Sequence, residues 1–402
     1  GMHHQVCVAL MGLPFHSDQA HTPEFYINIV RELLKRDIHF DSVCLKDASG
    51  TTDPHTCHET ARGIKAILPP EIPLIQHTHD TASTAVACYM AGIAGGVDGI
   101  DLAVRPLASG TSQPDVRSMA HALKGTGYSL DIDHTKMDEI ESLLNEGLSE
   151  YEFNPVTTSA DARVVGFPMP GGAIGPNVHM MQSAGILDKY SAVLAEFPEV
   201  VRAAGGWTSV TPGSQQYWLQ AFNNVLHGRW KKIDAGFGKS VLGYFGKPPL
   251  PPDTEVVKIA AEQLELPVFD GDPLEAAPDT LAEAEAALNE RGIEVTDENK
   301  FLVAAAIVPG KNMELNEGIR LLEGRSKITL PLKKKEPIGG ATLTAPTKTK
   351  VTVNEGGNTR TYEVIIEPPV SAAAPALGQA QTGGGQATDV FSPFDGNVEL
   401  VE

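Results

Sequence analysis

Residues 72–96 read IPLIQHTHDTASTAVACYMAGIAGG, and this stretch contains two patterns in succession. Its first four residues are typical of a short buried strand, whereas the small apolar residues from Ala85 onward are typical of a helix. His77 and His79 lie where the strand ends. A strand that runs directly into a helix is the repeating unit of parallel α/β proteins.

The same alternation of strand and helix surrounds this stretch. We predict strands at VCVALMGL (6–13), FDSVCLKDASG (40–50) and residues 96–110, and helices at residues 21–37 and 53–68. The first of these runs is apolar throughout, as expected of a strand that is buried on both faces. Strands and helices that alternate at this spacing predict parallel β/α units.

Polar residues collect at the ends of successive predicted strands. Lys46 and Asp47 end the second strand, His77 and His79 end the third, and Arg105 follows in the fourth. No G-x-G-x-x-G motif follows the first strand, so a dinucleotide-binding fold has little support. In a β/α barrel the active site lies at the C-terminal ends of the strands, and this pattern therefore favours a barrel.

The two histidines and the lysine suggest a metal site. Residues two apart in a strand point to the same face, so His77 and His79 project side by side, as a divalent metal requires. The alternative is a pair of surface histidines at a strand end. Lys46 has two interpretations: an ion pair with Asp47 or another carboxylate, or a desolvated amine that takes up carbon dioxide. The resulting carbamate would add an oxygen ligand suited to zinc, manganese or cobalt.

Composition limits the class of protein. The chain has 402 residues and is 42% hydrophobic, with 31 Lys+Arg against 51 Asp+Glu and a net charge of −20. This length predicts two or three domains, and the acidic balance argues against a nucleic-acid partner. The four cysteines show no C-x-x-C pair, which fits a reducing compartment. The longest apolar stretch is too short to span a bilayer and no signal peptide is recognised, so we expect a soluble, cytoplasmic protein.

The rest of the chain is predominantly helical up to about residue 330. Within it, PGGAIGPN (170–177) is interpreted as a glycine-proline loop, and residues 211–230 as a loop that opens a helix, which Thr211 or Ser214 could cap. Residues 330–337 are predicted to be a charged linker. Residues 349–367 predict a β-hairpin with a glycine turn.

Five short motifs occur in an order that resembles one known family. They are CLKDASG (44–50), QHTHDTAS (76–83), ASGTSQPD (108–115), PMPGGAIGPN (168–177) and SVTPGSQ (209–215). Together they resemble the carboxyltransferase domain of biotin-dependent enzymes. This family includes pyruvate carboxylase (especially its separate carboxyltransferase subunit), the oxaloacetate decarboxylase α subunit and the transcarboxylase subunit that acts on pyruvate.

The resemblance implies a fold and a division into domains. The fold would be α/β: the C-terminal half of a (β/α)8 TIM barrel (strands 5–8), a mainly helical C-terminal domain and the start of an all-β biotinyl domain. The implied segments are the half barrel (1–125), the helical carboxylase domain (126–330), a linker with a β-hairpin (331–367), a flexible Ala/Pro/Gly linker (368–388) and the biotinyl start (389–402).

The resemblance also implies an activity and its residues. The activity would be carboxyl transfer between carboxybiotin and pyruvate or oxaloacetate, through a metal-stabilised enolate. Lys46, as a carbamate, would be a metal ligand with His77 and His79, and Thr211 would carry a proton between biotin and pyruvate. Ser214 and Gln215 match biotin-pocket positions, and the glutamine is typical of the decarboxylase and two-subunit carboxylase branch. The implied cofactors are biotin and a divalent metal: zinc, or manganese or cobalt.

Partners follow from the same resemblance. They are a biotinyl carrier domain and either a biotin carboxylase subunit or a membrane decarboxylase subunit, with the chain itself forming a homo-oligomer. The family's upstream aspartate and arginine have no counterpart here, and the biotinyl segment stops before an A-M-K-M motif. We therefore expect a fragment, inactive alone, or a barrel that another chain or a second copy completes.

Two other functions stay open at the level of sequence. One is a metal-dependent barrel enzyme that condenses an acyl-CoA with a 2-oxo acid, since such enzymes also use an H-x-H pair. The other is a scaffold that binds a biotinylated partner without catalysing a reaction. The TPGSQ motif and the linker toward a biotinyl-like end favour the carboxyltransferase.

Overall fold

The structure is a computed structural model that describes residues 3–36, 38–211, 213–308, 311–326, 334, 347–355 and 358–366. The chain divides into two compact units, Gly1–Lys335 and Glu336–Glu402. The predicted linker 368–388 and biotinyl start 389–402 lie outside the described residues, and so does most of the charged linker.

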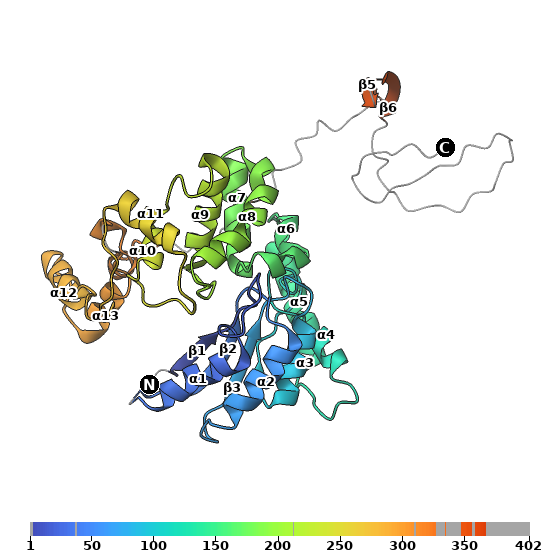
Figure 1. The fold of residues 1–402 in the computed structure, drawn as a ribbon. Helices are drawn as coiled ribbons and strands as arrows, with labels where there is room; N and C mark the ends of the chain where they lie inside the picture. The colour runs from blue at the N-terminus through green and yellow to red at the C-terminus, as the bar shows by residue number, and fades with distance from the viewer. Residues whose placement is uncertain are drawn as a thin grey trace. The chain divides into compact units, whose positions relative to one another are not determined.

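The first unit begins with a four-stranded parallel sheet (Figure 1). The order in the sheet, β1-β2-β3-β4, is also the order in the chain. The predicted α/β class with a parallel sheet is thus confirmed. The strands and the helices that connect them are β1 (Gln5–Ala9), α1 (Pro23–Leu34), β2 (Ser42–Asp47), α2 (Pro54–Lys65), β3 (Leu74–Thr78), α3 (Ala85–Gly95) and β4 (Gly99–Ile100).

The fourth strand is much shorter than predicted. Only Gly99 and Ile100 pair with β3, and most of the remaining predicted span is loop. One isolated bridge, from Ala103 to Asp115, continues the parallel direction. Arg105 lies in this loop and is exposed. Beyond Ile100 the chain does not continue its pairing with β3.

Local sequence explains where the first helices begin. The Thr22 hydroxyl accepts a hydrogen bond from the Phe25 backbone, and Pro23 occupies the first turn of α1. Asp53 and Pro54 repeat the arrangement at α2. A short polar N-cap followed by proline satisfies one orphan N–H group and removes another, so both helix starts could be read from the sequence.

The two faces of the sheet have different surroundings. Helices α1, α2 and α3 lie on one side of the strands (Figure 1), and one core joins that side of the sheet to α1 and α2. Val43, Leu45 and Leu74 belong to this core and are at most 1% exposed. Alternation along the strands places Cys44, Lys46 and His77 on the opposite face. The helix-covered face therefore stabilises the sheet, and the opposite face carries Lys46 and His77.

A second core forms the helical part of the first unit. It joins α7, α8, α9, α10 and α11 around large buried side chains that include Phe197, Tyr217 and Trp218. The helices that follow the sheet are α4 (Val116–Ala122), α5 (His134–Leu148), α6 (Pro155–Thr158), α7 (Gly171–Ser183), α8 (Tyr190–Ala203), α9 (Gly213–His227), α10 (Ala235–Val241) and α11 (Thr254–Leu264), with 3₁₀ helices at Ala162–Gly166 and Leu187–Lys189.

One prediction in this region is wrong. Residues 171–177, interpreted as a glycine-proline loop, form the first half of α7, and Pro176 lies inside that helix. Proline and glycine usually mark loops, and Pro176, the sixth residue of α7, cannot donate the intrahelical hydrogen bond expected at its position. Glycine at position 171 lets the helix start pack against backbone of the strand-end loops, which a local pattern does not reveal.

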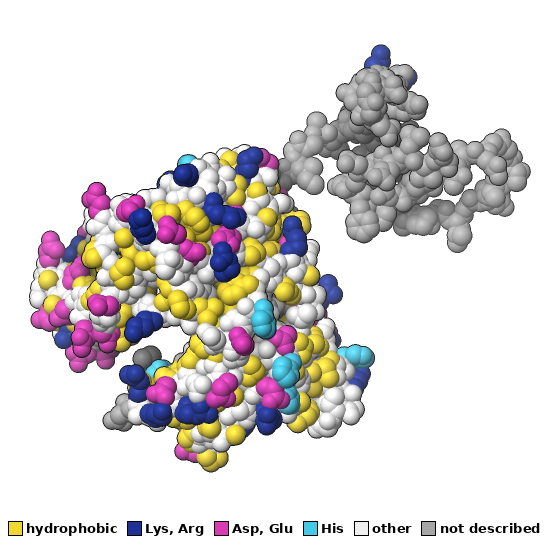
Figure 2. Space-filling view, viewed as in Figure 1, with side chains coloured by type: hydrophobic (Ala, Val, Ile, Leu, Met, Phe, Trp, Pro, Cys, Tyr) yellow, Lys and Arg dark blue, Asp and Glu magenta, His cyan; other side chains and the backbone are white. Residues whose placement is uncertain are grey.

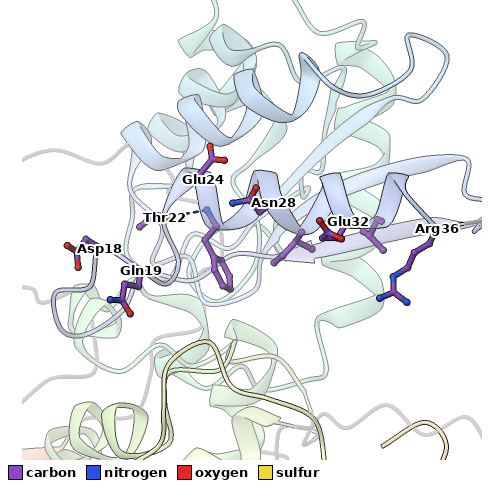
Figure 3. Close-up of a pocket in the computed structure, with 10 residues that line it drawn as sticks. Asp18, Gln19, Thr22, Glu24, Asn28, Glu32 and Arg36 are labelled. Atoms are coloured by element: carbon purple, nitrogen blue, oxygen red, sulfur yellow. Dashed lines mark hydrogen bonds between the residues drawn. The ribbon is translucent and has the colours of Figure 1, made fainter. Parts of the chain in front are cut away.

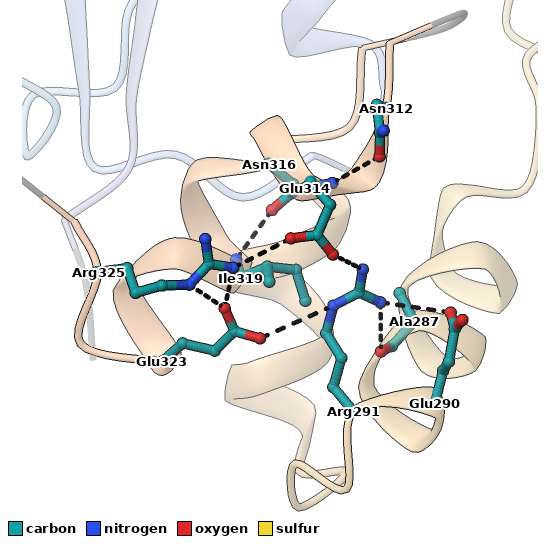
Figure 4. Close-up of polar contacts among 9 residues, drawn as sticks. All are labelled: Ala287, Glu290, Arg291, Asn312, Glu314, Asn316, Ile319, Glu323 and Arg325. Carbon is teal, nitrogen blue, oxygen red and sulfur yellow. Dashed lines mark hydrogen bonds and ion pairs between the residues drawn. The ribbon is translucent and has the colours of Figure 1, made fainter.

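A small helical cluster ends the first unit. It consists of α12 (Thr280–Glu290), α13 (Asp297–Ala304), a 3₁₀ helix (Met313–Leu315) and α14 (Glu317–Leu322), with its own apolar core around Leu288 and Ile319. Arg291 and Arg325 both contact Glu314 and Glu323, and these ion pairs connect the end of α12 to α14 (Figure 4). The predicted helical character of residues 278–324 is confirmed.

Acidic side chains gather on the surface of the same cluster (Figure 2). They include Glu283, Glu285, Asp297 and Glu298 of α12 and α13. Part of the chain's net charge of −20 is thus concentrated away from the sheet.

The second unit contains the predicted β-hairpin. Strand β5 (Thr347–Glu355) pairs antiparallel with β6 (Asn358–Ile366) over nine residue pairs, from Thr347–Ile366 to Glu355–Asn358. This register places the predicted glycine segment between the strands, and the hairpin is confirmed.

Candidate functional site

Three of the predicted site residues lie together at the C-terminal edge of the sheet. Lys46 of β2 is the direct register partner of His77 of β3, and His79 follows two residues later. The two imidazole rings have centroids 5.2 Å apart. The expectation that these histidines project side by side is therefore met by the described geometry.

His79 is held from its Nδ1 atom. This atom lies 2.6 Å from the backbone carbonyl oxygen of Thr111, in the ASGTSQPD loop. Burial lowers the pKa of His79 below its ordinary value; the carbonyl contact opposes this shift, and the nearby Lys46 and His77 add to it. A neutral imidazole with Nδ1–H bound to a carbonyl presents its Nε2 lone pair, which is the form that binds a metal.

His77 is held at both ring nitrogens. Its Nδ1 atom lies 2.9 Å from a carboxylate oxygen of Asp101, just beyond β4. Its Nε2 atom lies 3.2 Å from the side-chain nitrogen of Gln113. The sequence interpretation missed both partners. The only local signal was that each is a polar residue in the segment after the fourth strand.

The proposed ion pair between Lys46 and Asp47 does not form. The Asp47 carboxylate instead accepts hydrogen bonds from backbone N–H groups of Ser49, Gly50 and Thr52, which fold the loop after β2 around it. The Lys46 carbonyl accepts a hydrogen bond from the Leu10 backbone, but its side chain makes no hydrogen bond or ion pair within the described part of the chain. Its amine is therefore free to react or to bind at the face that carries the histidines.

The donor set fits a divalent metal in type. Two imidazole Nε2 atoms together with an oxygen from carbamylated Lys46 would make an N,N,O set, and His77 already has the carboxylate partner that metal-bound histidines usually have. Across the described residues, no group of three or more His, Cys, Asp or Glu side chains is arranged to hold a metal. Among the described residues, a metal at this edge would thus need Lys46 in addition to His77 and His79.

The segment with Thr211, Ser214 and Gln215 meets the same edge of the sheet. The Ser209 backbone N–H lies 3.4 Å from the sulfur of Met11, just after β1. The buried His21 side chain contacts the carbonyl oxygen of Gly206 at 2.7 Å. These contacts place the segment before α9 beside the end of β1, the strand next to the one that carries Lys46.

The three residues of this segment differ in exposure. Thr211 is exposed, Gln215 is half-buried, and Ser214 is fully buried with a hydroxyl that has no hydrogen-bond partner in the described residues. Neither hydroxyl accepts a hydrogen bond from a described backbone N–H group, so the simple helix-cap interpretation has no support in the geometry. The exposed Thr211 hydroxyl is accessible to a ligand, whereas the Ser214 hydroxyl lies below the surface.

A cavity of about 370 Å³ adjoins this segment. Trp207 forms one wall and its indole N–H lacks a partner among the described residues; Gly213 and Gln216, from the first turn of α9, also line the cavity. An aromatic wall with an unused N–H donor suits a flat molecule that carries a hydrogen-bond acceptor. The remaining lining residues are Ser240, Phe245, Gly246, Lys247 and Pro248.

A larger groove of about 560 Å³ lies elsewhere, along the outer side of α1 (Figure 3). Phe25, Ile29 and Leu33 form its apolar part, and Glu24 and Glu32 lie among its polar residues. None of the predicted site residues lines this groove, and it has no histidine or cysteine. We therefore assign the candidate site to the sheet edge.

Comparison with known protein families gives two matches. Residues 164–361 match the family described as the conserved carboxylase domain, and residues 15–144 match the HMGL-like family. The first match covers the helices from α7 to α14 and extends into the β-hairpin, and the second covers β2, β3 and β4 with the Lys46 and H-x-H motifs.

Individual proteins that resemble the chain are also carboxylase or carboxyltransferase subunits. The chain is 31% identical over 385 residues to a pyruvate carboxylase subunit of Methanocaldococcus jannaschii, which covers 95% of this chain and 64% of that protein. It is also 31% identical over 243 residues to the methylmalonyl-CoA carboxyltransferase 5S subunit of Propionibacterium freudenreichii subsp. shermanii, covering 60% of this chain and 48% of the relative. The chain thus spans less than two thirds of the length of these relatives.

A solved structure shares the fold. The carboxyl transferase domain of Rhizobium etli pyruvate carboxylase, solved with pyruvate, superposes with a TM-score of 0.65 at 19% identity, covering 90% of this chain and 65% of that one. The fold is therefore of the carboxyltransferase type.

Proposed function

Because the chain is related to the carboxyltransferases of the pyruvate carboxylase type, we propose that it transfers a carboxyl group between carboxybiotin and pyruvate or oxaloacetate. The observation that carries the proposal is the convergence of Lys46, His77 and His79 with the start of α9 at one edge of a parallel sheet. The matched relatives and the family described as the conserved carboxylase domain support it.

We assign the four strands to the second half of a (β/α)8 barrel, strands 5–8. Their sequential parallel order supports this, because a barrel places each strand beside the next in the chain. The domain boundaries at residues 125, 330, 367 and 388 are part of the same proposal, as is the assignment of the final segment to a biotinyl domain.

A divalent metal held by His77, His79 and carbamylated Lys46 would supply Lewis-acid stabilisation for the negative charge that develops on pyruvate. The two histidines are already oriented by partners at Nδ1. Lys46 lies beside His77 without an ion pair in the described residues, which leaves its amine available for the carbamate.

Thr211 would move the proton. In the direction from oxaloacetate, the bond between the carboxyl carbon and C3 breaks, and a new bond forms between that carbon and N1 of biotin. The N1 proton must then reach the carbon that becomes the methyl group of pyruvate. A hydroxyl both donates and accepts, so Thr211 could pass this proton without a net change in its own state.

Ser214 and Gln215 would position the biotin ring. Support comes from the cavity beside Trp207, whose lining residues Gly213 and Gln216 flank Ser214 and Gln215 in the chain. Biotin would arrive on a biotinyl carrier domain, and a biotin carboxylase subunit or a membrane decarboxylase subunit would determine the direction of the reaction. We include a homo-oligomeric assembly and a cytoplasmic location in the proposal. No described helix is both long and apolar enough to cross a bilayer.

The test is biotin-dependent decarboxylation of oxaloacetate by the full-length gene product. We expect activity in the wild type and a loss of about 100-fold or more in Thr211→Ala, the range for removal of a positioned acid-base group. Thr208→Ala, in the same loop, is the matched control and should retain activity. Turnover of acetyl-CoA with a 2-oxo acid, without biotin, would instead indicate the condensing enzyme; binding of a biotinylated carrier without turnover would indicate a scaffold.

A further inference from the structure

The two histidines at the sheet edge share a feature that the sequence motifs did not indicate. Each ring has its Nδ1 atom against an oxygen that belongs to a later loop: a carboxylate oxygen of Asp101 for His77 and the carbonyl oxygen of Thr111 for His79. We propose that Asp101 and the Thr111 carbonyl are positioning groups that hold both imidazoles as the Nδ1–H tautomer, so that both Nε2 lone pairs serve the same metal ion. This inference rests on the proposed function.

The contacts of His77 define its tautomer from both sides. The side-chain nitrogen of Gln113, 3.2 Å from Nε2, can only donate a hydrogen bond, so Nε2 must accept it. The proton of the neutral ring is then on Nδ1, which donates to the Asp101 carboxylate at 2.9 Å. Asp101 and Gln113 thus both favour a His77 ring whose unprotonated nitrogen is Nε2, and a cation bound there would replace the Gln113 contact.

His79 is also held as the Nδ1–H tautomer, but by a backbone carbonyl instead of a carboxylate. A backbone carbonyl has no proton to give, so the 2.6 Å contact requires the proton on Nδ1 of His79. With the proton on Nδ1, the neutral ring carries its lone pair on Nε2. A side-chain substitution at position 111 would leave this carbonyl in place, so Asp101 is the group that can be tested by mutation.

Both positioning groups are themselves fixed by the fold. The Thr111 backbone N–H and hydroxyl both donate to the carbonyl of Thr157, at 3.1 and 3.0 Å. The Asp101 backbone N–H donates to the carbonyl of Gln76 at 3.0 Å, and the Tyr89 hydroxyl donates to the Asp101 carbonyl. Asp101 is thus anchored to β3 and α3 although half of its side chain, 51%, is exposed.

Such partners of metal-binding histidines matter for affinity. A carboxylate or carbonyl on the remote nitrogen fixes the ring orientation and raises the basicity of the ligating nitrogen, and its loss typically costs about 10- to 100-fold in metal affinity. Without Asp101, the His77 ring could rotate or exchange its proton between the two nitrogens. We therefore expect Asp101 to affect the metal site without contacting the substrate.

The first readout needs no metal. Nitrogen-15 NMR of the imidazole rings, assigned with His77→Ala and His79→Ala, reports which ring nitrogen carries the proton at a pH where both rings are neutral. We expect Nδ1–H for both rings in the wild-type protein. In Asp101→Ala we expect the Nδ1–H form of His77 to become less populated, because only the Gln113 contact at Nε2 still favours it, while His79 keeps the Nδ1–H form. Asp131→Ala, a change at an exposed carboxylate, is the matched control.

The second readout is Co²⁺ affinity, measured by titration of the metal-free protein supplied with bicarbonate. We expect Asp101→Ala to weaken Co²⁺ binding by about 10- to 100-fold, and Asp101→Asn to weaken it less, because the amide oxygen still accepts from Nδ1–H. Co²⁺ binding and a His77 tautomer that are both unchanged in Asp101→Ala would overturn the inference. Nδ1–H rings in a wild-type protein that binds no Co²⁺ would overturn the proposed metal site and, with it, the assigned role of Asp101.

Discussion

Gly171 offers a sharp test of how the helical region supports the histidine site. A Cβ atom added at this position would lie 2.1 Å from the carbonyl oxygen of Thr111 and 2.5 Å from Nδ1 of His79. Both distances are well below van der Waals contact, so Gly171→Ala must displace the helix start, the Thr111 loop or the His79 ring. Each of these movements disturbs the hydrogen bond between His79 and Thr111.

The matched control is the next residue in the same helix. A Cβ atom at Gly172 would have no heavy atom within 4 Å. Gly172→Ala should therefore be neutral or stabilise the protein by up to about 1 kcal/mol, because alanine loses less backbone entropy in a helix. Gly171→Ala should destabilise it by about 1–3 kcal/mol, the usual cost of overpacking. The two adjacent substitutions thus have opposite expected signs.

The assay is urea denaturation of both variants, together with nitrogen-15 NMR of the His79 ring. We expect Gly171→Ala to lower the free energy of unfolding and to alter the His79 resonances, and Gly172→Ala to do neither. Equal stability of the two variants with an unchanged His79 ring would show that α7 does not pack against this site, and the described arrangement would be wrong.

Two further predictions concern the histidines at the sheet edge and the buried His21. His77→Ala or His79→Ala should each weaken binding of Co²⁺ beyond the roughly 100-fold expected for loss of a supporting partner, and a variant that retained wild-type affinity would contradict the ligand assignment. Burial lowers the pKa of His21, so the unfolded chain binds more protons at this residue than the folded protein. The free energy of unfolding should therefore fall as the pH drops below about 6.5. His21→Gln should reduce the dependence of this free energy on pH, measured by denaturation between about pH 5 and pH 7.5. An unchanged pH dependence would assign the acid sensitivity to other groups.

The sequence was most informative where structure depends on near neighbours. Apolar runs predicted β1, β2 and β3, and the Thr22–Pro23 and Asp53–Pro54 pairs marked the starts of α1 and α2. The spacing of two between His77 and His79 predicted that the side chains project together, and their centroids lie 5.2 Å apart. These features were predictable because strand and helix periodicities repeat within a few residues.

The errors arose where distant segments determine local conformation. PGGAIGPN has the composition of a loop, yet its helix packs against backbone about 60 residues earlier in the chain, and the gain from that packing outweighs poor local propensity. The short β4 reflects the same limit, because a strand exists only as far as a neighbour pairs with it.

The sequence by itself thus determined the α/β class and the order of the first strands and helices, and it supplied the candidate residues for holding a metal or moving a proton. Only the tertiary structure showed that Asp101 and Thr111, 24 and 32 residues from the histidines they contact, orient those rings, and that Asp47 folds its own loop instead of pairing with Lys46. The physical reason is range: periodicity acts between neighbours in the chain, whereas a hydrogen bond or a close packing contact depends on which segments the fold brings together.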